Sequence, residues 1–516
     1  MGKDHISTRI ATIIIILPVL VLCTAGIFLC GISSAPQRNW DTWGAHEKQY
    51  EALTESISTH HIALGERPAE FLSELDNPYD PVERSIAAAE HDSYALIDIA
   101  YYNDKYYVYF GLTPELLVFF PFKLITGRTL PTWIADIFMA LLCVPAAFLF
   151  CRLLIRRFSD RGSSDILLVT AFGILLIGAI GLPYLAALCT TYSMPSVTGL
   201  FLILCGLSVF LAAESPDGKI SRPHLIIGSV LLALTIGCRP TLCLAFLLLF
   251  GIFADAVKRG DFFRLRGNSM ANTLCVLIPA ALTSLPFLAY NLLRFGSPFD
   301  FGYHYLLTTR DLLHGTKSLG ESIASAWLLL LSPVKFSAEF PFMQIFDYTG
   351  QYADTLYVEP LFGGLLPLHP FITAGLVLLP VACILSAKKG GQSAEQITMK
   401  ASKAAAGLHP VLISVISLIT GIVILFTDSV VAGVSQRYSS DFALFFFIPS
   451  MIGFYLTFAV IRSKRPRLAY LLAAAAVLFM IIEVFVSASS ILCDGRYFAM
   501  KDWNTEVYER ISGVFR

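Results

Sequence analysis

Long apolar runs recur along the whole chain of 516 residues and are separated by shorter polar segments. A run such as ATIIIILPVLVLCTAGIFLCG, at 11–31, is uninterrupted and does not alternate between polar and apolar positions. A helix of about 20 apolar residues crosses the roughly 30 Å hydrocarbon core of a bilayer, whereas a membrane β-barrel needs short alternating segments. The pattern therefore predicts an all-α integral membrane protein.

We expect about eleven transmembrane helices in a single polytopic domain that covers 1–516. The predicted helices lie near 10–31, 130–155, 164–185, 194–213, 224–238, 241–257, 270–291, 366–386, 407–426, 441–461 and 468–489. The first helix is followed by a large loop at 32–129, helices two to seven by a second large loop at 292–365, and the last helix by a tail at 490–516.

The composition supports a membrane protein, and the positions of the charged residues predict its orientation in the membrane. The chain is 56% hydrophobic and 15% charged, with a mean hydropathy of +0.67, whereas soluble domains carry about 25% charge. Lys and Arg accumulate in cytoplasmic loops of membrane proteins. If the N-terminus is inside, the predicted inner loops hold clusters of four cations at 152–161, 258–266, 388–403 and 462–467. We therefore predict a multi-pass protein of the cell membrane with a cytoplasmic N-terminus and an extracytoplasmic C-terminus.

The first apolar run has an alternative interpretation as a cleaved signal peptide. Ser33, Ser34 and Ala35 offer small residues for a cleavage site. The run is longer than the 7–15 apolar residues typical of such a peptide, so we expect it to be retained as a transmembrane helix.

The two large loops place most of the polar chemistry on the outer face. From 32 to 115 the chain holds fifteen Asp and Glu against five Lys and Arg, a net charge near −10. Loops this long in a compact protein usually carry function. The apolar segments at 112–127 and 322–336 are too short to span, and we interpret both as interfacial helices that lie along the outer leaflet.

Motifs for nucleotide chemistry are absent from the sequence. There is no phosphate-binding Walker loop, no GxGxxG after a strand and no cytosolic segment long enough for an αβ domain. An enzyme that works on the outer face must then take its activated group from a membrane carrier. Nothing in the sequence indicates a nucleic acid as a partner.

Carboxylates in the first loop are candidates for a general base toward a sugar or alcohol hydroxyl. Asp41 and Glu47 follow the first helix, and Asp80 and Asp98 lie further along the loop. Asp80 stands between Pro78 and Pro81, which restrict its backbone, and Arg84 is near enough to orient it. The alternative is that these acids merely solvate the loop.

Three arginines at predicted outer boundaries suit a lipid phosphate, because a guanidinium can hold phosphate oxygens in a bidentate fork. They are Arg239 in GCRPTL, Arg294 in NLLRFGSPF and Arg437 in SQRYSSDF, where Tyr438 follows. Snorkelling to the interface or pairing with loop acids is the alternative.

Aromatic residues fill the run YYNDKYYVYFG at 101–111. Tyr102, Tyr106 and Tyr107 could stack on a sugar ring, or they could belong to an interfacial aromatic belt.

Histidines and cysteines point to no metal centre or disulfide framework. His60, His61 and His91 match no closed metal-site spacing, so we expect neither a metal ion nor another cofactor. Most of the eleven cysteines lie inside apolar runs, which is typical of core positions.

Several of these segments resemble a known family when they are taken together. NPYDP before Arg84, Asp98 before YYNDKYYVYFG, RPT at 239–241, NLLRFGSPFDFGYHY and QRYSSDF are similar to bacterial membrane glycosyltransferases of the GT-C superfamily, of the protein-mannosyltransferase-like family-39 type. The resemblance implies a helical bundle whose large first outer loop contains membrane-parallel helices and supplies an Asp as base. Relatives often place this acid close behind the first span as Asp-Glu, but here Thr42 follows Asp41.

We therefore predict transfer of a sugar from a polyprenyl-phosphate donor to a glycan, lipid or protein acceptor of the cell envelope. The base stays open among Asp41, Glu47, Asp80 and Asp98. Two alternatives remain: a lipid or solute transporter or flippase, and a cell-surface polysaccharide polymerase or ligase. Transporters usually carry charges within their spans, and Glu483 is the main such charge here.

Overall fold

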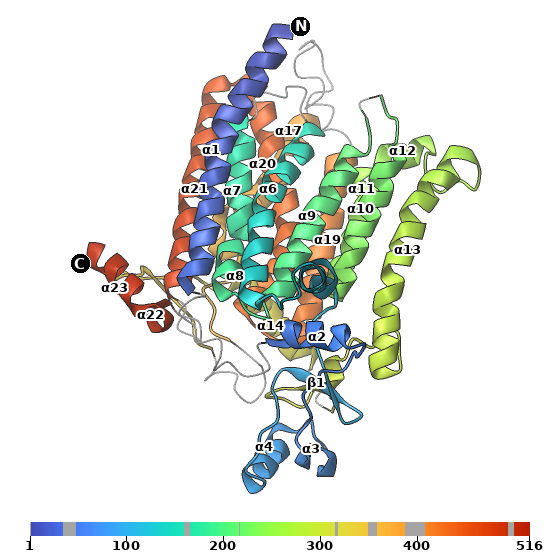
Figure 1. The fold of residues 1–516 in the computed structure, drawn as a ribbon. Coiled ribbons are helices and arrows are strands. Elements are labelled where there is room, and N and C mark those ends of the chain that lie inside the picture. Colours follow the sequence, from blue (N-terminus) through green and yellow to red (C-terminus); the bar gives the residue numbers. More distant parts are fainter. Residues whose placement is uncertain are drawn as a thin grey trace.

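The computed structural model describes residues 2–34, 48–158, 166–215, 217–314, 318–348, 359–387, 408–493 and 500–515. Most of these residues are helical, and the long helices run side by side in one bundle (Figure 1). Short helices and strands gather at one end of the bundle, and the N-terminus lies at the other. The chain is therefore a mostly helical multi-pass membrane protein, as the apolar runs predict.

Seven described helices are long and apolar enough to cross a membrane. They are α1 (Gly2–Ser34), α6 (Thr132–Arg156), α9 (Met194–Ala212), α13 (Gly267–Phe295), α19 (Leu408–Val431), α20 (Ser439–Lys464) and α21 (Pro466–Cys493). An eighth span results if α7 (Ile166–Ala179) and α8 (Leu182–Leu188) cross as one unit with a bend of 44°. Gly181 lies at the bend with φ of +66°, a conformation that glycine adopts without strain.

The other three predicted spans correspond to shorter helical pieces. They are α10 (Arg222–Leu234) with η4 (Thr235–Gly237); η5 (Pro240–Leu247) with α11 (Leu248–Ile252) and α12 (Ala254–Arg259); and α16 (Leu365–Leu368) with α17 (Pro370–Ala387). Pro240 and Pro370 begin new pieces because proline lacks the N–H that would continue the preceding helix. The count of eleven spans thus stays a prediction.

Helix α20 lies in the centre of the bundle and packs against α17 and α19. Its side chains Phe442, Phe445 and Phe447 are fully buried. The backbones of α17 and α20 approach closely, since a Cβ on Gly375 would lie 2.4 Å from the carbonyl oxygen of Ser450. Small residues permit such close packing between membrane helices.

A small lobe lies at one end of the bundle, and we use this name for α2–α4 and β1–β3 (Figure 1). The lobe consists of α2 (Gln49–Ser58), α3 (Phe71–Glu74), α4 (Pro81–Glu90), β1 (Ile99–Tyr102), β2 (Lys105–Tyr107) and β3 (Leu306–Leu307). Its sheet is antiparallel with the order β2-β1-β3, and Ile99 pairs with Leu307. The first and second large loops therefore meet in one sheet.

Two short apolar elements lie beside the lobe, where the sequence predicts interfacial helices. The first segment forms η3 (Glu115–Phe119) and α5 (Phe120–Thr126), and the second forms α14 (Leu319–Leu331). Leu124 and Ile125 of α5 are 69% and 84% exposed. Exposed leucine and isoleucine suit contact with lipid, so the membrane-parallel placement remains our prediction.

Glu115 is buried at the junction between η3 and α2. Its Oε2 atom lies 3.0 Å from the hydroxyl of Thr54, which is also 2.8 Å from the carbonyl oxygen of Tyr50. The single Thr54 hydroxyl proton is shared between these two acceptors, and Oε1 of Glu115 has no hydrogen-bond partner among the described residues, so the buried carboxyl is poorly solvated as an anion. Burial, and to a smaller extent the nearby Glu51 carboxylate, raise the pKa of Glu115 to about 8.

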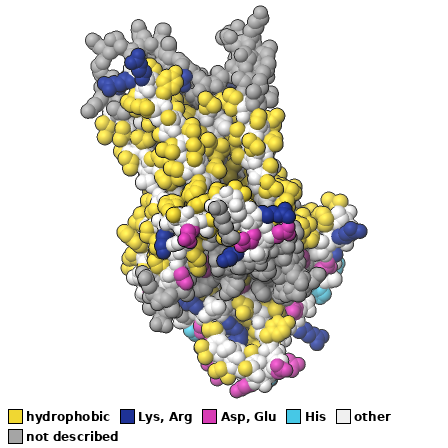
Figure 2. All heavy atoms as spheres, turned by 90° about the vertical axis from the view of Figure 1, so that its left-hand side faces the viewer, with side chains coloured by type: hydrophobic (Ala, Val, Ile, Leu, Met, Phe, Trp, Pro, Cys, Tyr) yellow, Lys and Arg dark blue, Asp and Glu magenta, His cyan; other side chains and the backbone are white. Residues whose placement is uncertain are grey.

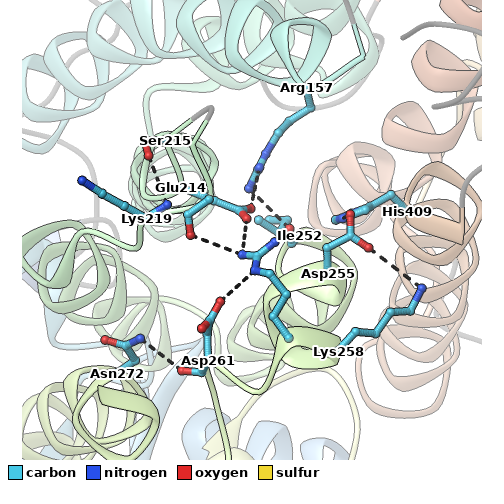
Figure 3. A network of polar contacts seen from close by, with 12 residues as sticks. Arg157, Glu214, Ser215, Lys219, Ile252, Asp255, Lys258, Asp261, Asn272 and His409 are labelled. Carbon is cyan, nitrogen blue, oxygen red and sulfur yellow. Dashed lines mark hydrogen bonds and ion pairs between the residues drawn. The ribbon is translucent and has the colours of Figure 1, made fainter. Parts of the chain in front are cut away.

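At the end of the bundle away from the lobe, a network of ion pairs connects the helices (Figure 3). Glu214, which follows α9, accepts hydrogen bonds from Arg157 at 2.8 Å and from Arg259 at 2.7 Å. Asp255 of α12 lies 2.8 Å from His409 of α19. These contacts join α6, α9, α12 and α19 at the end where the predicted cytoplasmic cations lie.

The distribution of side-chain types on the surface is consistent with a bundle whose middle part lies in the membrane. Figure 2 shows hydrophobic side chains over the middle of one face and charged side chains toward its two ends. The remaining described elements are η6 (Tyr303–Tyr305), β4 (Lys335–Phe336), β5 (Met343–Gln344), η7 (Gln436–Tyr438), α22 (Met500–Trp503) and α23 (Thr505–Val514).

Candidate functional site

Two arginines flank one tyrosine ring at the lobe end of the bundle. Arg437 and Tyr438 belong to η7, which leads into α20, and Arg239 precedes η5. The guanidinium carbon lies 5.5 Å from the centre of the Tyr438 ring for Arg239 and 5.1 Å for Arg437. The hydroxyl of Tyr438 also accepts a hydrogen bond from Arg437, at 3.2 Å. Arg239 and Arg437 are 198 positions apart in the sequence, yet both guanidinium groups lie near the ring of Tyr438.

Carboxylates partly balance these cations. Arg239 donates from Nη1 to Oδ2 of Asp441 at 2.6 Å, and Arg437 lies 3.9 Å from Glu359. Asp428, near the end of α19, is also buried and lies close enough to Arg239 to interact with it electrostatically. Buried guanidinium groups need such counter-charges, because an unpaired buried ion is costly.

Each of the two guanidinium groups keeps a buried donor without a partner. The Nε–H groups of Arg239 and Arg437 make no hydrogen bond to any described residue. A buried unsatisfied donor costs about 1–3 kcal/mol, so native proteins usually give it a water or a ligand. The two donors therefore mark a place for an acceptor group.

Asp98 is joined to this cluster through a tyrosine. The hydroxyl of Tyr192 donates to Oδ2 of Asp98 at 2.5 Å, and the Tyr192 ring lies 4.7 Å from the guanidinium carbon of Arg437. Asp98 is held by the lobe, since its N–H donates to the carbonyl of Leu307 at 2.7 Å and its own carbonyl accepts from Gln49 at 2.8 Å. We call Asp98, Tyr192, Arg239, Arg437, Tyr438 and Asp441 the acid–arginine cluster.

Asp80 and Arg84 lie elsewhere in the lobe and have structural contacts. Asp80 is the N-cap of α4, and its Oδ1 atom accepts hydrogen bonds from the backbone of Val82 at 2.7 Å and Glu83 at 3.3 Å. Arg84 donates to the carbonyls of Pro78 at 2.9 Å and Thr308 at 2.5 Å. The Arg84 guanidinium thus connects the two large loops, and Arg84 contacts Asp80 only through the backbone bond from its N–H to the Asp80 carbonyl, at 3.0 Å.

Arg294 is also apart from the cluster. It is 5% exposed and donates to the carbonyl of Val108 at 2.6 Å and to the side chain of Asn291 at 2.7 Å. Its guanidinium carbon lies 3.9 Å from the centre of the Tyr290 ring. These contacts anchor the end of α13 to the first large loop.

The three candidate sugar-stacking tyrosines pack within the lobe. Tyr102 and Tyr107 contact the ring of Phe295 at centroid distances of 5.8 and 5.7 Å, and Tyr106 contacts Tyr101 at 6.1 Å. Tyr106 and Tyr107 are buried. Tyr109, two residues after Tyr107, lies near the cluster instead. Burial raises the pKa of Tyr109 to about 12, although the nearby charges of Arg239 and Arg437 lower it.

Two candidate bases, Asp41 and Glu47, fall outside the described residues. Three members of the neighbourhood were missed by sequence reasoning: Tyr192, Asp441 and Tyr109. Tyr192 lies in the short predicted outer loop at 186–193, and such a loop must stay close to the bundle end. Asp441 lies within the QRYSSDF segment that also holds Arg437.

The described residues contain no group of three or more His, Cys, Asp or Glu side chains placed to hold a metal ion. The acid–arginine cluster instead combines Asp98, whose carboxylate accepts a hydrogen bond from Tyr192, with two arginines that each keep an unpaired Nε–H. Comparison with known proteins adds no relative: no family model, no curated protein and no solved structure matches the chain.

Proposed function

We propose that this protein is a membrane glycosyltransferase that moves a sugar from a polyprenyl-phosphate donor to an acceptor hydroxyl outside the membrane. The observation that carries the proposal is the link from Asp98 through Tyr192 to Arg437. The proposed base then contacts the hydroxyl of Tyr192, and the proposed phosphate-binding cation lies over the ring of the same residue. Such a reaction needs both, one for the attacking hydroxyl and one for the leaving group.

Asp98 is the proposed base among the described candidates. Tyr192 occupies Oδ2, which leaves Oδ1 to accept the proton of the acceptor hydroxyl. The acceptor oxygen forms a bond to the anomeric carbon while the bond from that carbon to the phosphate oxygen breaks, with inversion. The electron pair leaves with the lipid phosphate, and the proton moves to Asp98.

Arg239, Arg437 and Tyr438 are the proposed ligands of the lipid phosphate. The unpaired Nε–H groups offer two donors to phosphate oxygens. Negative charge builds up on the phosphate as the sugar departs, so donors fixed in advance stabilise the transition state more than the ground state. Arg294 also keeps an unpaired Nε–H, but it is not part of this proposal, because its other contacts lie with Val108, Asn291 and Tyr290 and not with the acid–arginine cluster.

The test is a donor panel offered to the purified full-length protein in lipid nanodiscs. Labelled polyprenyl phosphates that carry different sugars are incubated with the protein, and release of the bare lipid phosphate is measured. Arg437→Gln is expected to abolish release, whereas Arg462→Gln, at the far end of the helix α20 into which η7 leads, keeps it. Consumption of no donor across a broad panel, or equal rates for the two variants, contradicts the proposal.

A further inference from the structure

The C-terminal helix α23 leaves the bundle sideways. Figure 1 shows α23 projecting from the bundle at the level where α1 and α21 end. Asn504 links α23 to α1, because its Nδ2–H donates to the carbonyl oxygen of Ser33 at 2.9 Å. The same side chain caps α23 by accepting a hydrogen bond from the N–H of Val507 at 3.3 Å. A helix that projects sideways at the ends of membrane-spanning helices lies near the boundary between lipid and water.

The apolar and the charged residues of α23 occupy opposite faces. At 3.6 residues per turn, the apolar residues share one face: Val507, Tyr508, Ile511 and Val514. The charged residues share the other face: Glu506, Glu509 and Arg510. Arg510 and Glu506 form an exposed ion pair at 2.5 Å on this second face. The helix is therefore amphipathic, as helices that lie along a bilayer surface are.

The rest of the protein covers only the first turns of the apolar face. Tyr508 is buried, and its ring lies 5.3 Å from that of Phe340 between centroids. Val514, in the last turn, is 79% exposed, and Phe515, directly after the helix, is 58% exposed. The apolar face of α23 thus extends beyond the protein surface that covers it.

A row of aromatic rings connects this exposed tip to the membrane-spanning helix α21. The Phe342 ring lies 5.2 Å from that of Phe515 and 6.3 Å from that of Phe485 on α21. Phe336 of β4 is exposed and lies 6.3 Å from Phe485 as well. Ile481, one turn before Phe485 on α21, is also exposed, as lipid-facing residues of a spanning helix are. We call Phe336, Phe342, Phe485, Val514 and Phe515 the C-terminal patch.

We propose that the C-terminal patch inserts into the lipid leaflet at the lobe end of the bundle and anchors α23 there. Its partner is the boundary between headgroups and acyl chains, because the patch is continuous with the lipid-facing side of α21. Residues 500–515 hold two basic and three acidic side chains, so anionic headgroups do not attract this segment. The inference is independent of the proposed function.

A second copy of the chain fits the C-terminal patch less well. The exposed parts of its phenylalanine and valine side chains amount to roughly 400 Å². Each partner of a stable protein complex usually buries about 800 Å². Lipid has no such minimum area, since each apolar side chain that enters the leaflet contributes separately.

Photo-crosslinking of the full-length protein in lipid nanodiscs tests the proposed contact. A photoreactive benzoylphenylalanine replaces Phe515, Phe336 or, as the matched control, Tyr94, an exposed aromatic residue between α4 and β1 of the lobe. After irradiation in phosphatidylcholine nanodiscs, the mass of the intact protein reports lipid adducts. We expect adducts at 515 and 336, none at 94, and the same yields when phosphatidylglycerol is added.

Two neighbouring substitutions test whether lipid contact holds α23 in place. Val514→Asp puts a carboxylate at the exposed tip of the apolar face. Gly513→Asp puts it on the charged face, where an added Cβ meets no atom within 4 Å. We expect amide hydrogen exchange in α23 to be about tenfold faster in Val514→Asp and unchanged in Gly513→Asp, because a carboxylate is disfavoured among acyl chains.

The other outcomes contradict the inference. Adduct yields at 515 that do not exceed those at 94 place the patch outside the bilayer. A cross-linked dimer in place of lipid adducts shows that a second copy covers the patch. Adducts that require phosphatidylglycerol indicate recognition of an anionic headgroup instead of insertion of apolar side chains. Equal exchange rates in the two Asp variants refute the anchoring of α23.

Discussion

Replacement of Asp98 by Asn is the sharpest test of the proposed base, because almost every contact of the residue survives. Asp98 has a φ of +57°, which Asn tolerates as well as Asp. Its backbone bonds to Leu307 and Gln49 do not involve the side chain, and the amide oxygen of Asn can still accept from Tyr192. The substitution therefore removes the charge and the proton-accepting ability and leaves the geometry.

The expected loss of activity is much larger than the loss of stability. A charge-assisted hydrogen bond becomes a neutral one, which costs about 1 kcal/mol of folding free energy. Loss of a general base lowers the rate by about 10²–10⁴-fold, or about 3–5 kcal/mol in the activation barrier. Single-turnover transfer from a labelled polyprenyl-phosphate sugar measures the chemical step without product release.

Asp80→Asn is the matched control in the same loop. Asn caps a helix as well as Asp does, so α4 keeps its N-cap and both stability and transfer stay near wild type. A single-turnover rate for Asp98→Asn within threefold of wild type refutes Asp98 as the base. Asp41→Asn and Glu47→Gln complete the series, and a loss in one of these instead of Asp98→Asn transfers the role to that residue.

Three further predictions concern stability. Glu115 is protonated in the folded state up to about pH 8 but ionises near pH 4.5 in the unfolded state. Its contribution to the free energy of unfolding therefore falls by up to about 5 kcal/mol between pH 4.5 and 8. Denaturant unfolding of Glu115→Gln should lack this dependence of stability on pH. Removal of either partner of the Arg239–Asp441 pair should cost about 3–5 kcal/mol, and a double-mutant cycle that shows no coupling contradicts the ion pair. Gly375→Ala should destabilise the protein by about 1–3 kcal/mol, because the new methyl group meets the backbone of Ser450; an unchanged melting temperature contradicts this contact.

The sequence was most informative about helices that cross the membrane in one piece. Seven predicted spans coincide with long helices, since about 20 apolar residues leave few other structures. The breaks were harder to predict. The break before Pro370 lies inside the predicted span 366–386, and the bend at Gly181 lies inside the predicted span 164–185 and depends on how α7 and α8 pack. Hydrophobicity alone does not distinguish a continuous helix from two short ones.

The candidate site was only partly predictable for a different reason. Arg239 and Arg437 were proposed because arginines at predicted outer boundaries suit a lipid phosphate, and Tyr438 because it follows Arg437; the structure brings these three together. Arg294 satisfies the same sequence criterion but lies apart from them, because its direction depends on the rotation of α13 about its axis. Rotation is a property of packing, and a single sequence does not reveal it.

The choice of arginine allows the acid–arginine cluster to pair its buried charges and still offer donors to the proposed lipid phosphate. A guanidinium has five N–H donors on a rigid plane, whereas an ammonium presents one compact charge. Arg239 gives Nη1 to Asp441 and keeps Nε–H unpaired, so the counter-charge required for burial does not use up the donors. A lysine at this position would lie beside Asp441 as a point charge, and an incoming phosphate would have to compete with that carboxylate. Arg239→Lys is therefore not a conservative change at this site.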